Sequence, residues 1–340
     1  MNVTALPVRV RILILVVAVL LLGAAGTAYV LRARQAASVQ GAAASPSAPV
    51  SGPAGAPAVP EAGDLLVVGA GPSADSGVVL AVGDDGRRRS TGMRCKRFYA
   101  ASGTGVCLRV EAGLVTRSQA VVVDDRMREV RTVSLSGVPS RARVSPSGRM
   151  VAWTFFVTGD SYLTTGFSTR AGILDTRDGT LVKNLEEFTL RKDGRVLRSP
   201  DLNYWGVTFA SDDNRFYATV STQGRTYLVQ GDFAGRGMRV LRENAECPSL
   251  SPDETRVVYK KRTGGPSDPW RLHVLDLRSG RETPLAEPAN VDDQAAWLDD
   301  RTVMYAKLRG DSSDVWTVPA DGSGRPELLL RDAFSPAPGR

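Results

Sequence analysis

The stretch CPSLSPDETRVVYKKRTGGPSDPWRLHVLDLRSGRETPL, residues 247–285, decides the fold because it reads as four short strands joined by turns. Its start is extended, since proline pushes the residue before it out of the helical region. The runs Val257-Val258-Tyr259 and 272–277 have the β-branched and aromatic composition that strands favour. Ser-Pro-Asp-Glu and Thr-Gly-Gly-Pro supply turn chemistry between the runs. Four antiparallel strands in about forty residues have the size of one propeller blade.

Weaker copies of this stretch recur before and after it. The turn and strand of residues 251–259 are matched by residues 145–153, 211–218 and 298–305, and more faintly by 102–108. The next strand and its closing turn, residues 274–280, are matched by residues 173–179, 315–322 and, loosely, 227–232. The repeats predict an all-β, six-bladed β-propeller with blades near residues 64–92, 93–137, 138–186, 203–242, 245–287 and 290–330.

The first blade lacks its innermost strand, and an open edge strand in the ring would invite aggregation. Residues 332–337, Asp-Ala-Phe-Ser-Pro-Ala, resemble the Ser-Pro strands that begin other blades. We therefore expect the C-terminal segment to complete the first blade and close the ring.

The Ser-Pro-Asp-x-x-Arg-hydrophobic-hydrophobic-Tyr turn and the Leu-Asp-x-x-x-Gly closure resemble the TolB-like family of β-propellers, whose repeats are also called WD40-like PD40 repeats. The resemblance covers about residues 64–337 and is strongest at residues 251–259 and 145–153. It implies a six-bladed propeller with an extracytoplasmic address that serves mainly as a protein-interaction platform. TolB itself carries a separate α/β domain before the propeller, so its partners are not carried over. Because the motif marks a structural turn, it argues for the fold rather than for a function.

The N-terminal part predicts a membrane tether. Residues 12–31, ILILVVAVLLLGAAGTAYVL, are uncharged, and a helix over them spans about 30 Å, the thickness of a bilayer core. We expect a single-pass transmembrane signal anchor after a short cytoplasmic tail, residues 1–11, with the propeller on the extracytoplasmic side. The alternative is a signal peptide cleaved near Gly26-Thr27-Ala28 and a secreted protein. Residues 32–62, rich in Ala, Pro, Ser and Gly, predict a disordered linker before the propeller at 63–340.

Composition limits the class of partner. The formal net charge is +7, from 43 Lys and Arg against 36 Asp and Glu, and no basic block is interleaved with aromatics. Nucleic acid is therefore not an expected partner. The prevalence of Arg over Lys, with abundant Ala, Gly and Val, suggests a high-GC bacterial genome. We expect a protein partner in the bacterial cell envelope, of unknown identity.

The three cysteines are too few for a disulfide framework. Cys95 and Cys107 fall on neighbouring strands of one predicted blade, so they either form one bridge or remain two buried thiols. Cys247 is then left single. The cysteines and the single His273 have no metal-binding spacing, and no metal or cofactor is expected.

Catalytic chemistry has little support in the sequence. His273 lies between Leu272 and Val274 in a predicted strand, which favours a packing role over a general base. No Gly-x-Ser-x-Gly elbow and no phosphate-binding loop occur. The frequent acidic pairs have the spacing of blade turns and do not match a calcium loop. The sequence therefore predicts a protein that is not an enzyme.

Two places depart from the repeat and are the candidate sites. The hairpin within residues 187–201 carries Arg191, Lys192 and Arg195 and is either a partner-contacting arm or an ordinary solvated hairpin. The strands that border the channel bring the second group of candidates, which is Asn203, Trp205, Asp292 and Asp293.

The alternative for the second group is that the tryptophans pack between blades. Three functions follow in order of preference: an interaction or scaffold propeller, a small-ligand-binding sensor subunit, and a propeller lyase or glycosidase. Convergence of Asp292, Asp293 and Glu246 in a deep pocket would favour the last of these. A flat channel mouth with an exposed apolar patch would favour the first.

Overall fold

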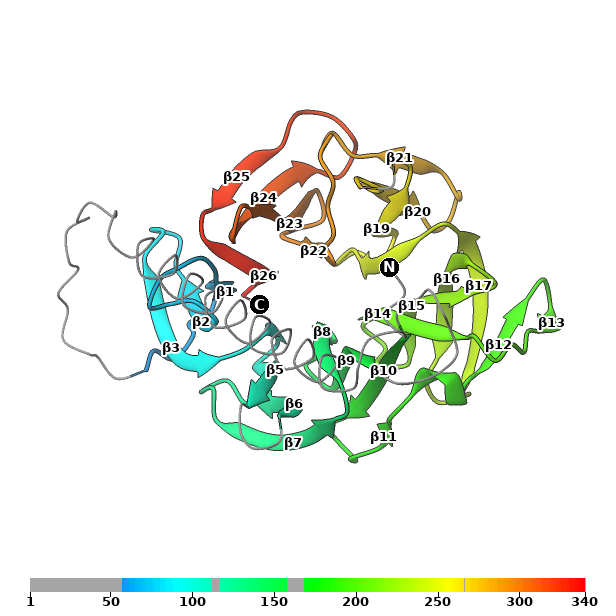
Figure 1. Cartoon of the computed structure of the whole chain (residues 1–340), viewed down its shortest axis with the longest axis horizontal. Helices are drawn as coiled ribbons and strands as arrows, with labels where there is room; N and C mark the ends of the chain where they lie inside the picture. The colour runs from blue at the N-terminus through cyan, green and yellow to red at the C-terminus, as the bar shows by residue number, and fades with distance from the viewer. Residues whose placement is uncertain (1–56, 112–115, 158–167, 266, 340) are drawn as a thin grey trace, which may run out of the picture. The chain divides into compact units, whose positions relative to one another are not determined.

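Six sheets, antiparallel except for one parallel strand pair, form a ring in the computed structural model, which describes residues 57–111, 116–157, 168–265 and 267–339. Figure 1 shows each sheet as one blade, with its first strand nearest the centre and its last strand at the rim. The predicted six-bladed propeller is confirmed over these residues. The predicted anchor and most of the predicted linker lie outside them.

From the centre of the ring outward the strands follow chain order, except that β26 begins blade one and the earlier hairpin β12–β13 ends blade four. Blade one contains β26 (Ala333–Ala337), β1 (Leu65–Gly69), β2 (Val78–Val82) and β3 (Arg88–Arg94). Blade two contains β4 (Arg97–Ala101), β5 (Thr104–Glu111), β6 (Arg117–Val123) and β7 (Glu129–Leu135). Blade three contains β8 (Val138–Val144), β9 (Met150–Val157), β10 (Ser168–Asp175) and β11 (Leu181–Val182).

The second half of the ring has the same order. Blade four contains β14 (Asn203–Phe209), β15 (Arg215–Thr222), β16 (Arg225–Asp232), β17 (Gly237–Glu243), β12 (Thr189–Lys192) and β13 (Arg195–Val196). Blade five contains β18 (Glu246–Leu250), β19 (Arg256–Arg262), β20 (Trp270–Asp276) and β21 (Glu282–Pro284). Blade six contains β22 (Ala296–Trp297), β23 (Thr302–Arg309), β24 (Ser312–Pro319) and β25 (Glu327–Leu330).

The central strands of the blades are apolar on both faces because each blade packs between two neighbours. All five residues of β2, Val-Val-Leu-Ala-Val, are buried. Six apolar clusters fill the six interfaces between adjacent blades; Leu108 of blade two, for example, shares a cluster with Trp153 of blade three. At about 25 cal/mol per Å² of buried apolar surface, these interfaces are the main source of stability.

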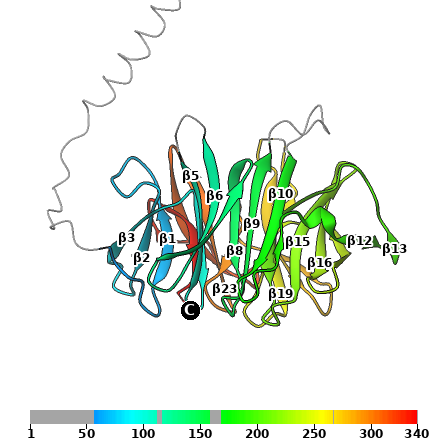
Figure 2. The ribbon, with the colours of Figure 1, turned by 90° about the horizontal axis from the view of Figure 1, so that it is seen from below.

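The ring is closed by the C-terminal strand, as the sequence predicts. β26 pairs antiparallel with β1, with Leu66 opposite Ala337 and Gly69 opposite Ala333. The backbone N–H of Ala70 also donates to the carbonyl of Asp332 at 2.9 Å. Figure 2 shows the ring from the side, with the strands running between its two faces and the C-terminus at the lower one.

The structured part begins earlier than the sequence predicts. Residues 57–62, expected to end the linker, run along blade one: the N–H of Ala58 donates to the carbonyl of Ser90 at 2.8 Å. Arg89 forms ion pairs with Glu61 at 2.5 Å and Asp64 at 2.6 Å. The ion pair at Glu61, a second one just after the segment at Asp64, and a backbone hydrogen bond hold a segment whose composition by itself is typical of a linker.

The described residues contain no helix of the length and apolarity that crossing a membrane requires. The helical element between blades three and four is a single turn of 3-10 helix, Leu185–Glu187, capped by the Asn184 side chain.

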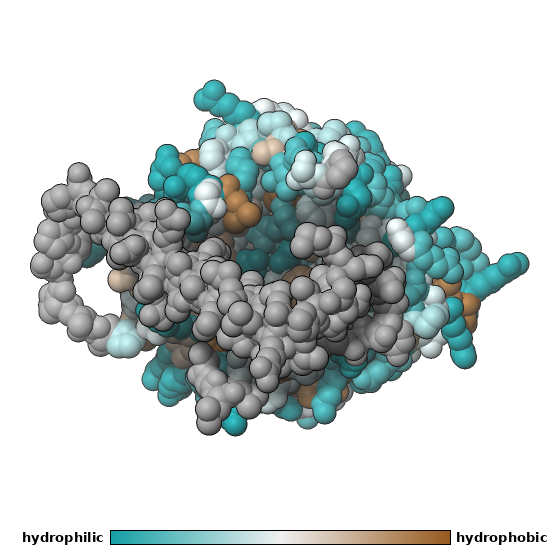
Figure 3. Space-filling model, in the orientation of Figure 1, coloured by the Kyte–Doolittle hydropathy of each residue, from teal (hydrophilic) through white to brown (hydrophobic). Residues whose placement is uncertain are grey.

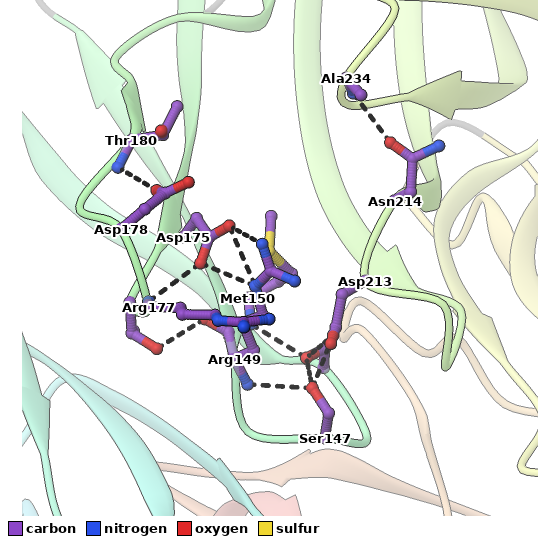
Figure 4. Close-up of polar contacts among 12 residues, drawn as sticks. Ser147, Arg149, Met150, Asp175, Arg177, Asp178, Thr180, Asp213, Asn214 and Ala234 are labelled. Carbon is purple, nitrogen blue, oxygen red and sulfur yellow. Dashed lines mark hydrogen bonds and ion pairs between the residues drawn. The ribbon is translucent and has the colours of Figure 1, made fainter.

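The Ser-Pro turn of the repeat holds neighbouring blades together. The Ser145 hydroxyl accepts a hydrogen bond from the backbone N–H of Met150 at 3.0 Å and donates to Asp213 of the next blade at 2.8 Å. Figure 4 shows Asp213 facing Ser147, whose hydroxyl donates to the same carboxylate oxygen at 2.6 Å. Asp300 likewise accepts from the backbone N–H of Asp253. These acidic residues lie in turns, as predicted, and they also form contacts between blades, which the sequence did not predict.

The closing Asp of the repeat anchors the second strand of its blade. The Asp175 carboxylate is 2% exposed and binds the Arg149 guanidinium through Nε at 2.9 Å and Nη2 at 2.5 Å (Figure 4). This hydrogen bond lowers the pKa of Asp175, against the opposing effect of burial. Its contribution to stability is therefore present at neutral pH and is lost as the pH falls through the lowered pKa.

We expect Asp175→Asn to reduce the free energy of unfolding by about 2 kcal/mol at pH 7, because a charge-assisted pair in a buried site is lost. The deficit relative to wild type should shrink by pH 3, where the wild-type carboxylate loses its advantage. Urea unfolding at both pH values measures this. Asp125→Asn, at an exposed turn position, is the control. A deficit that is the same at pH 3 and pH 7 would assign the effect to shape rather than charge.

Cys95 and Cys107 form a disulfide with a sulfur–sulfur distance of 2.06 Å, and Cys247 is free and buried. The bridge joins the segment before β4 to its neighbour β5. Of the two alternatives that the sequence leaves open, the structure contains the disulfide bridge.

Candidate functional site

A cavity of about 920 Å³ lies at the mouth of the central channel, at the end of the ring where the innermost strands begin. All six blades line this mouth cavity, each with at least one residue: Phe334, Arg97, Arg141, Trp205, Lys260 and Asp292. On the face shown in Figure 3, the described surface is mostly hydrophilic, with hydrophobic residues scattered over it. Because every blade contributes, the cavity exists only in the closed ring.

Two arginines meet on the wall of the mouth cavity. Nε of Arg97 and Nη1 of Arg141 both donate to the carbonyl oxygen of Ser140, at 2.9 Å and 3.0 Å. Two guanidinium groups that share one acceptor must lie beside each other. Burial, and then the positive charge of Arg141, lower the pKa of Arg97. Desolvated donors of this kind bind anions more strongly than donors in water.

Asp292 faces this pair, and its negative charge is already partly compensated by neighbouring cations. Its carboxylate binds Nζ of Lys260 at 2.6 Å and lies 3.6 Å from Nη2 of Arg141. Burial opposes ionisation, but the charges of Lys260 and Arg141 hold the pKa of Asp292 below its ordinary value. The side chain is still 51% exposed. Asp292 is therefore a carboxylate that is open to the cavity.

The other acidic residues predicted for the mouth cavity are engaged with protein groups. Asp293 accepts a hydrogen bond from the backbone N–H of Ala306 at 3.1 Å and is buried. Glu246 accepts from Nε1 of Trp270 at 3.3 Å and lies 3.6 Å from the Arg262 guanidinium. The three acids that the sequence singled out do converge in one cavity. Only Asp292 among them is substantially exposed.

Of the two remaining predicted channel residues, one lines the mouth cavity and the other joins two blades. Trp205 lines the mouth cavity. Asn203 is buried, and its Oδ1 accepts hydrogen bonds from the backbone N–H and hydroxyl of Thr169 at 2.8 and 2.5 Å. It ties blade four to blade three, which is a structural contact.

The predicted arm, Arg191, Lys192 and Arg195, lies at the rim of blade four, where the hairpin β12–β13 extends the sheet. β12 pairs in parallel with β17, with Leu190 opposite Met238. The buried side chains of Leu190 and Phe188 anchor the hairpin in the core. The structure does not bring the arm and the mouth cavity together, so they are separate surfaces.

Apolar side chains stand at the rim of the mouth cavity. Val138 is 56% exposed, Phe156 37% and Leu308 83%. They come from blade three and blade six, at strand ends on the mouth face. An exposed apolar rim around a polar floor is typical of surfaces that bind other molecules.

Sequence reasoning missed Arg97, Arg141 and Lys260. Arg97 is the first residue of β4 and Arg141 the fourth residue of β8, and both strands are the innermost of their blades. A place on an innermost strand, which borders the channel, was an available signal. Their convergence depends on the closure of the ring and could not be read from local pattern.

His273 lies on β20, outside the mouth cavity. It is buried, and its ring is 6.1 Å from that of Tyr259. Burial lowers its pKa, which keeps the imidazole neutral. Within the described ranges, no group of three or more His, Cys, Asp or Glu side chains is placed to hold a metal ion.

No protein-family model matches the chain, and no curated protein matches it either. Solved structures do share its fold. TolB from Acinetobacter baumannii is 14% identical with a TM-score of 0.56, over 82% of this chain and 66% of that one. A propeller chain from a nidogen/laminin complex is 10% identical with a TM-score of 0.53, over 82% of this chain and 98% of that one.

A puromycin-hydrolyzing peptidase of Mycobacterium tuberculosis is 15% identical with a TM-score of 0.50, over 79% of this chain and 45% of that one. The chain thus spans about two thirds of that TolB and less than half of that peptidase. At these identities the likeness shows the propeller fold, in agreement with the resemblance to TolB-like repeats.

Proposed function

We propose that this protein is a protein-interaction propeller of the bacterial cell envelope, tethered to the membrane by residues 12–31, with its propeller on the extracytoplasmic side. The partner binds at the mouth cavity. The observation that carries the proposal is the combination of one cavity lined by all six blades with the exposed rim of Val138, Phe156 and Leu308. A protruding segment of a partner can bury the rim and reach the charged floor.

The fold neighbours are consistent with this role, since one of them was solved in a nidogen/laminin complex and two thirds of a TolB chain superimposes on this ring. The uncharged stretch 12–31 and the linker-like composition after it support the tether.

A small-ligand-binding sensor is the second candidate. It is favoured by the volume of the mouth cavity, about 920 Å³, which is in the range of small-molecule sites. The half-exposed Asp292 beside Lys260 and Arg141 gives that cavity polar specificity. A lyase or glycosidase activity ranks third, because Asp293 and Glu246 are engaged with protein donors and the pKa of Asp292 is lowered rather than raised.

Photo-crosslinking from the rim tests the interaction. A photoreactive residue in place of Leu308 in the full chain, expressed in its native cells, is expected to capture a specific protein reproducibly. The control is the same residue in place of Arg278, an exposed position in the turn at the other end of β20. Capture of the same proteins from both positions, or of none from Leu308, would contradict the proposal.

Fractionation in the same cells tests the tether. The chain is expected in the membrane pellet after an alkaline wash and in a form accessible to protease added outside the cytoplasm. A shorter chain in the soluble extracytoplasmic fraction would instead support the cleaved and secreted alternative.

A further inference from the structure

The floor of the mouth cavity holds more positive charge than its own acids compensate. Five cationic side chains, Arg97, Arg141 and Lys260 among them, and four acidic ones line the cavity in the described residues, which leaves one positive charge in excess. Over the described residues, Arg97 has no carboxylate within ion-pair distance, and Arg141 has only the 3.6 Å contact with Asp292. That carboxylate is held more closely by Lys260, at 2.6 Å.

The arginines also keep unused donors. Nε of Arg141 is buried and has no hydrogen-bond partner among the residues that the structure describes. Nη1 of the same side chain donates to the carbonyl and hydroxyl oxygens of Ser140, and Nε of Arg97 donates to that carbonyl as well. A neutral carbonyl oxygen positions both guanidinium groups without neutralising either of them.

This arrangement is unfavourable in the free protein. Two cations lie side by side out of bulk water, which costs electrostatic energy that Asp292 and Asp293 only partly offset. An anion that entered between them would relieve the repulsion and fill the unused donors. Guanidinium groups are suited to carboxylates because their planar N–H groups match the two oxygens.

The neighbouring acids select the charge of that anion. Asp292 is half exposed beside the arginines and would repel a second negative charge. One excess positive charge matches a single carboxylate better than a phosphate dianion. The apolar rim of Val138 and Leu308 matches apolar residues next to that carboxylate in a peptide.

We infer that Arg97 and Arg141 bind one carboxylate of an acidic, otherwise apolar segment of a partner protein inserted into the mouth cavity. This rests on the proposed function and deepens it, since it states the chemistry of the partner segment.

Tryptophan fluorescence of the full chain measures the binding, because Trp205 and Trp270 line the cavity. The probe is the peptide Ala-Leu-Glu-Leu-Ala with both ends blocked, compared with the same peptide carrying Gln, with a free-C-terminus version of the Gln peptide, and with inorganic phosphate. The Glu peptide is expected to bind at least about tenfold more tightly than the blocked Gln peptide, as the loss of a charge-assisted hydrogen bond implies. If the free-C-terminus Gln peptide binds more tightly than the Glu peptide, the bound carboxylate is the one at a chain end.

Arg97→Gln and Arg141→Gln are each expected to weaken binding of the Glu peptide at least about tenfold. Arg195→Gln, on the rim hairpin, is the matched control and should bind as wild type does. The Arg97→Gln chain without peptide should have a Tm equal to or above that of wild type, because the substitution removes a repulsive charge. Equal binding of the Glu and blocked Gln peptides, unchanged binding by both variants, tighter binding of phosphate, or no binding of any peptide would overturn the inference.

Crosslinking from Leu308 separates this inference from the proposed function. If the double variant Arg97→Gln/Arg141→Gln captures the partner as well as wild type does, the interaction stands and the carboxylate contact is wrong. If wild type captures nothing but binds the Glu peptide with the expected selectivity, the carboxylate site stands and the partner protein is wrong.

Discussion

Removal of residues 331–340 is expected to abolish cooperative unfolding of the propeller and to make the protein aggregate. The deletion takes away β26, the innermost strand of blade one, and with it the pairing to β1. Ala333 and Ala337 are fully buried in the apolar clusters on the two sides of that blade. The Leu-Leu-Val-Val-Gly strand β1 would then become a free edge in the channel.

The interactions lost on deletion extend beyond blade one. The Ser335 hydroxyl donates to the carbonyl of Phe98 in blade two at 2.8 Å. The Asp332 carboxylate accepts from Arg309 at 2.6 Å and Ser312 at 2.7 Å in blade six. One short segment, residues 332–337, therefore connects three blades, and its loss leaves the ring open between the two chain ends.

A point substitution tests the same closure without shortening the chain. Ala337→Asp places an unpaired charge beside Leu66 and Val68 and is expected to reduce the free energy of unfolding by about 3–5 kcal/mol. Leu329→Asp, on the preceding strand β25 with a 40% exposed side chain, should change it by about 0.5 kcal/mol or less. Urea unfolding with size-exclusion chromatography measures both. Equal losses for the two variants would show that closure is not the stabilising element.

The second large effect is expected from Gly231→Val in blade four. Gly231 lies directly opposite Phe216 in the β15–β16 pair, and a Cβ atom there would lie far inside contact distance of the Phe216 ring. Phe216 is fully buried and packs edge-on against Phe188, with ring centroids 5.7 Å apart. The ring cannot move aside without displacing the anchor of the β12–β13 hairpin.

We expect Gly231→Val to reduce the free energy of unfolding by about 3 kcal/mol or more, through overpacking of a rigid core. The matched control is Gly237→Val in the same blade, where the nearest atom to an added Cβ, the carbonyl oxygen of Gly235, is 3.9 Å away. Thermal unfolding compares the two. Because Phe188 leads into the hairpin, proteolysis near Arg195 should also become faster in Gly231→Val but not in the control. A Tm within about 2 °C of wild type would contradict the packing argument.

Most of the architecture could be predicted from local sequence chemistry. The Ser-Pro turns, the β-branched runs and the Asp-Gly closures recur, so each blade could be predicted from its own residues. The composition of residues 57–62 by itself predicts a linker. Their order comes from Arg89, which is distant in sequence and binds Glu61 and Asp64.

The candidate site was only partly predictable. The sequence predicts Asp292, Asp293 and Trp205 at the channel because strand order in a blade determines which residues face the centre, and in the structure these three residues line the mouth cavity. Asn203 was assigned to the same group but supports Thr169 instead. Arg97 and Arg141 belong to no sequence motif. They lie together because both donate to one acceptor, the Ser140 carbonyl.

The sequence by itself determined the repeat, the number of blades and the closing strand, because these depend on short-range turn chemistry and on an edge that must be paired. Only the tertiary structure decided which charges meet. Closure of the ring joins residues as distant as Phe98 and Ser335, which are 237 positions apart, and electrostatic compensation is a property of distance in space. An excess positive charge beside the Ser140 carbonyl therefore becomes visible only when the ring is closed.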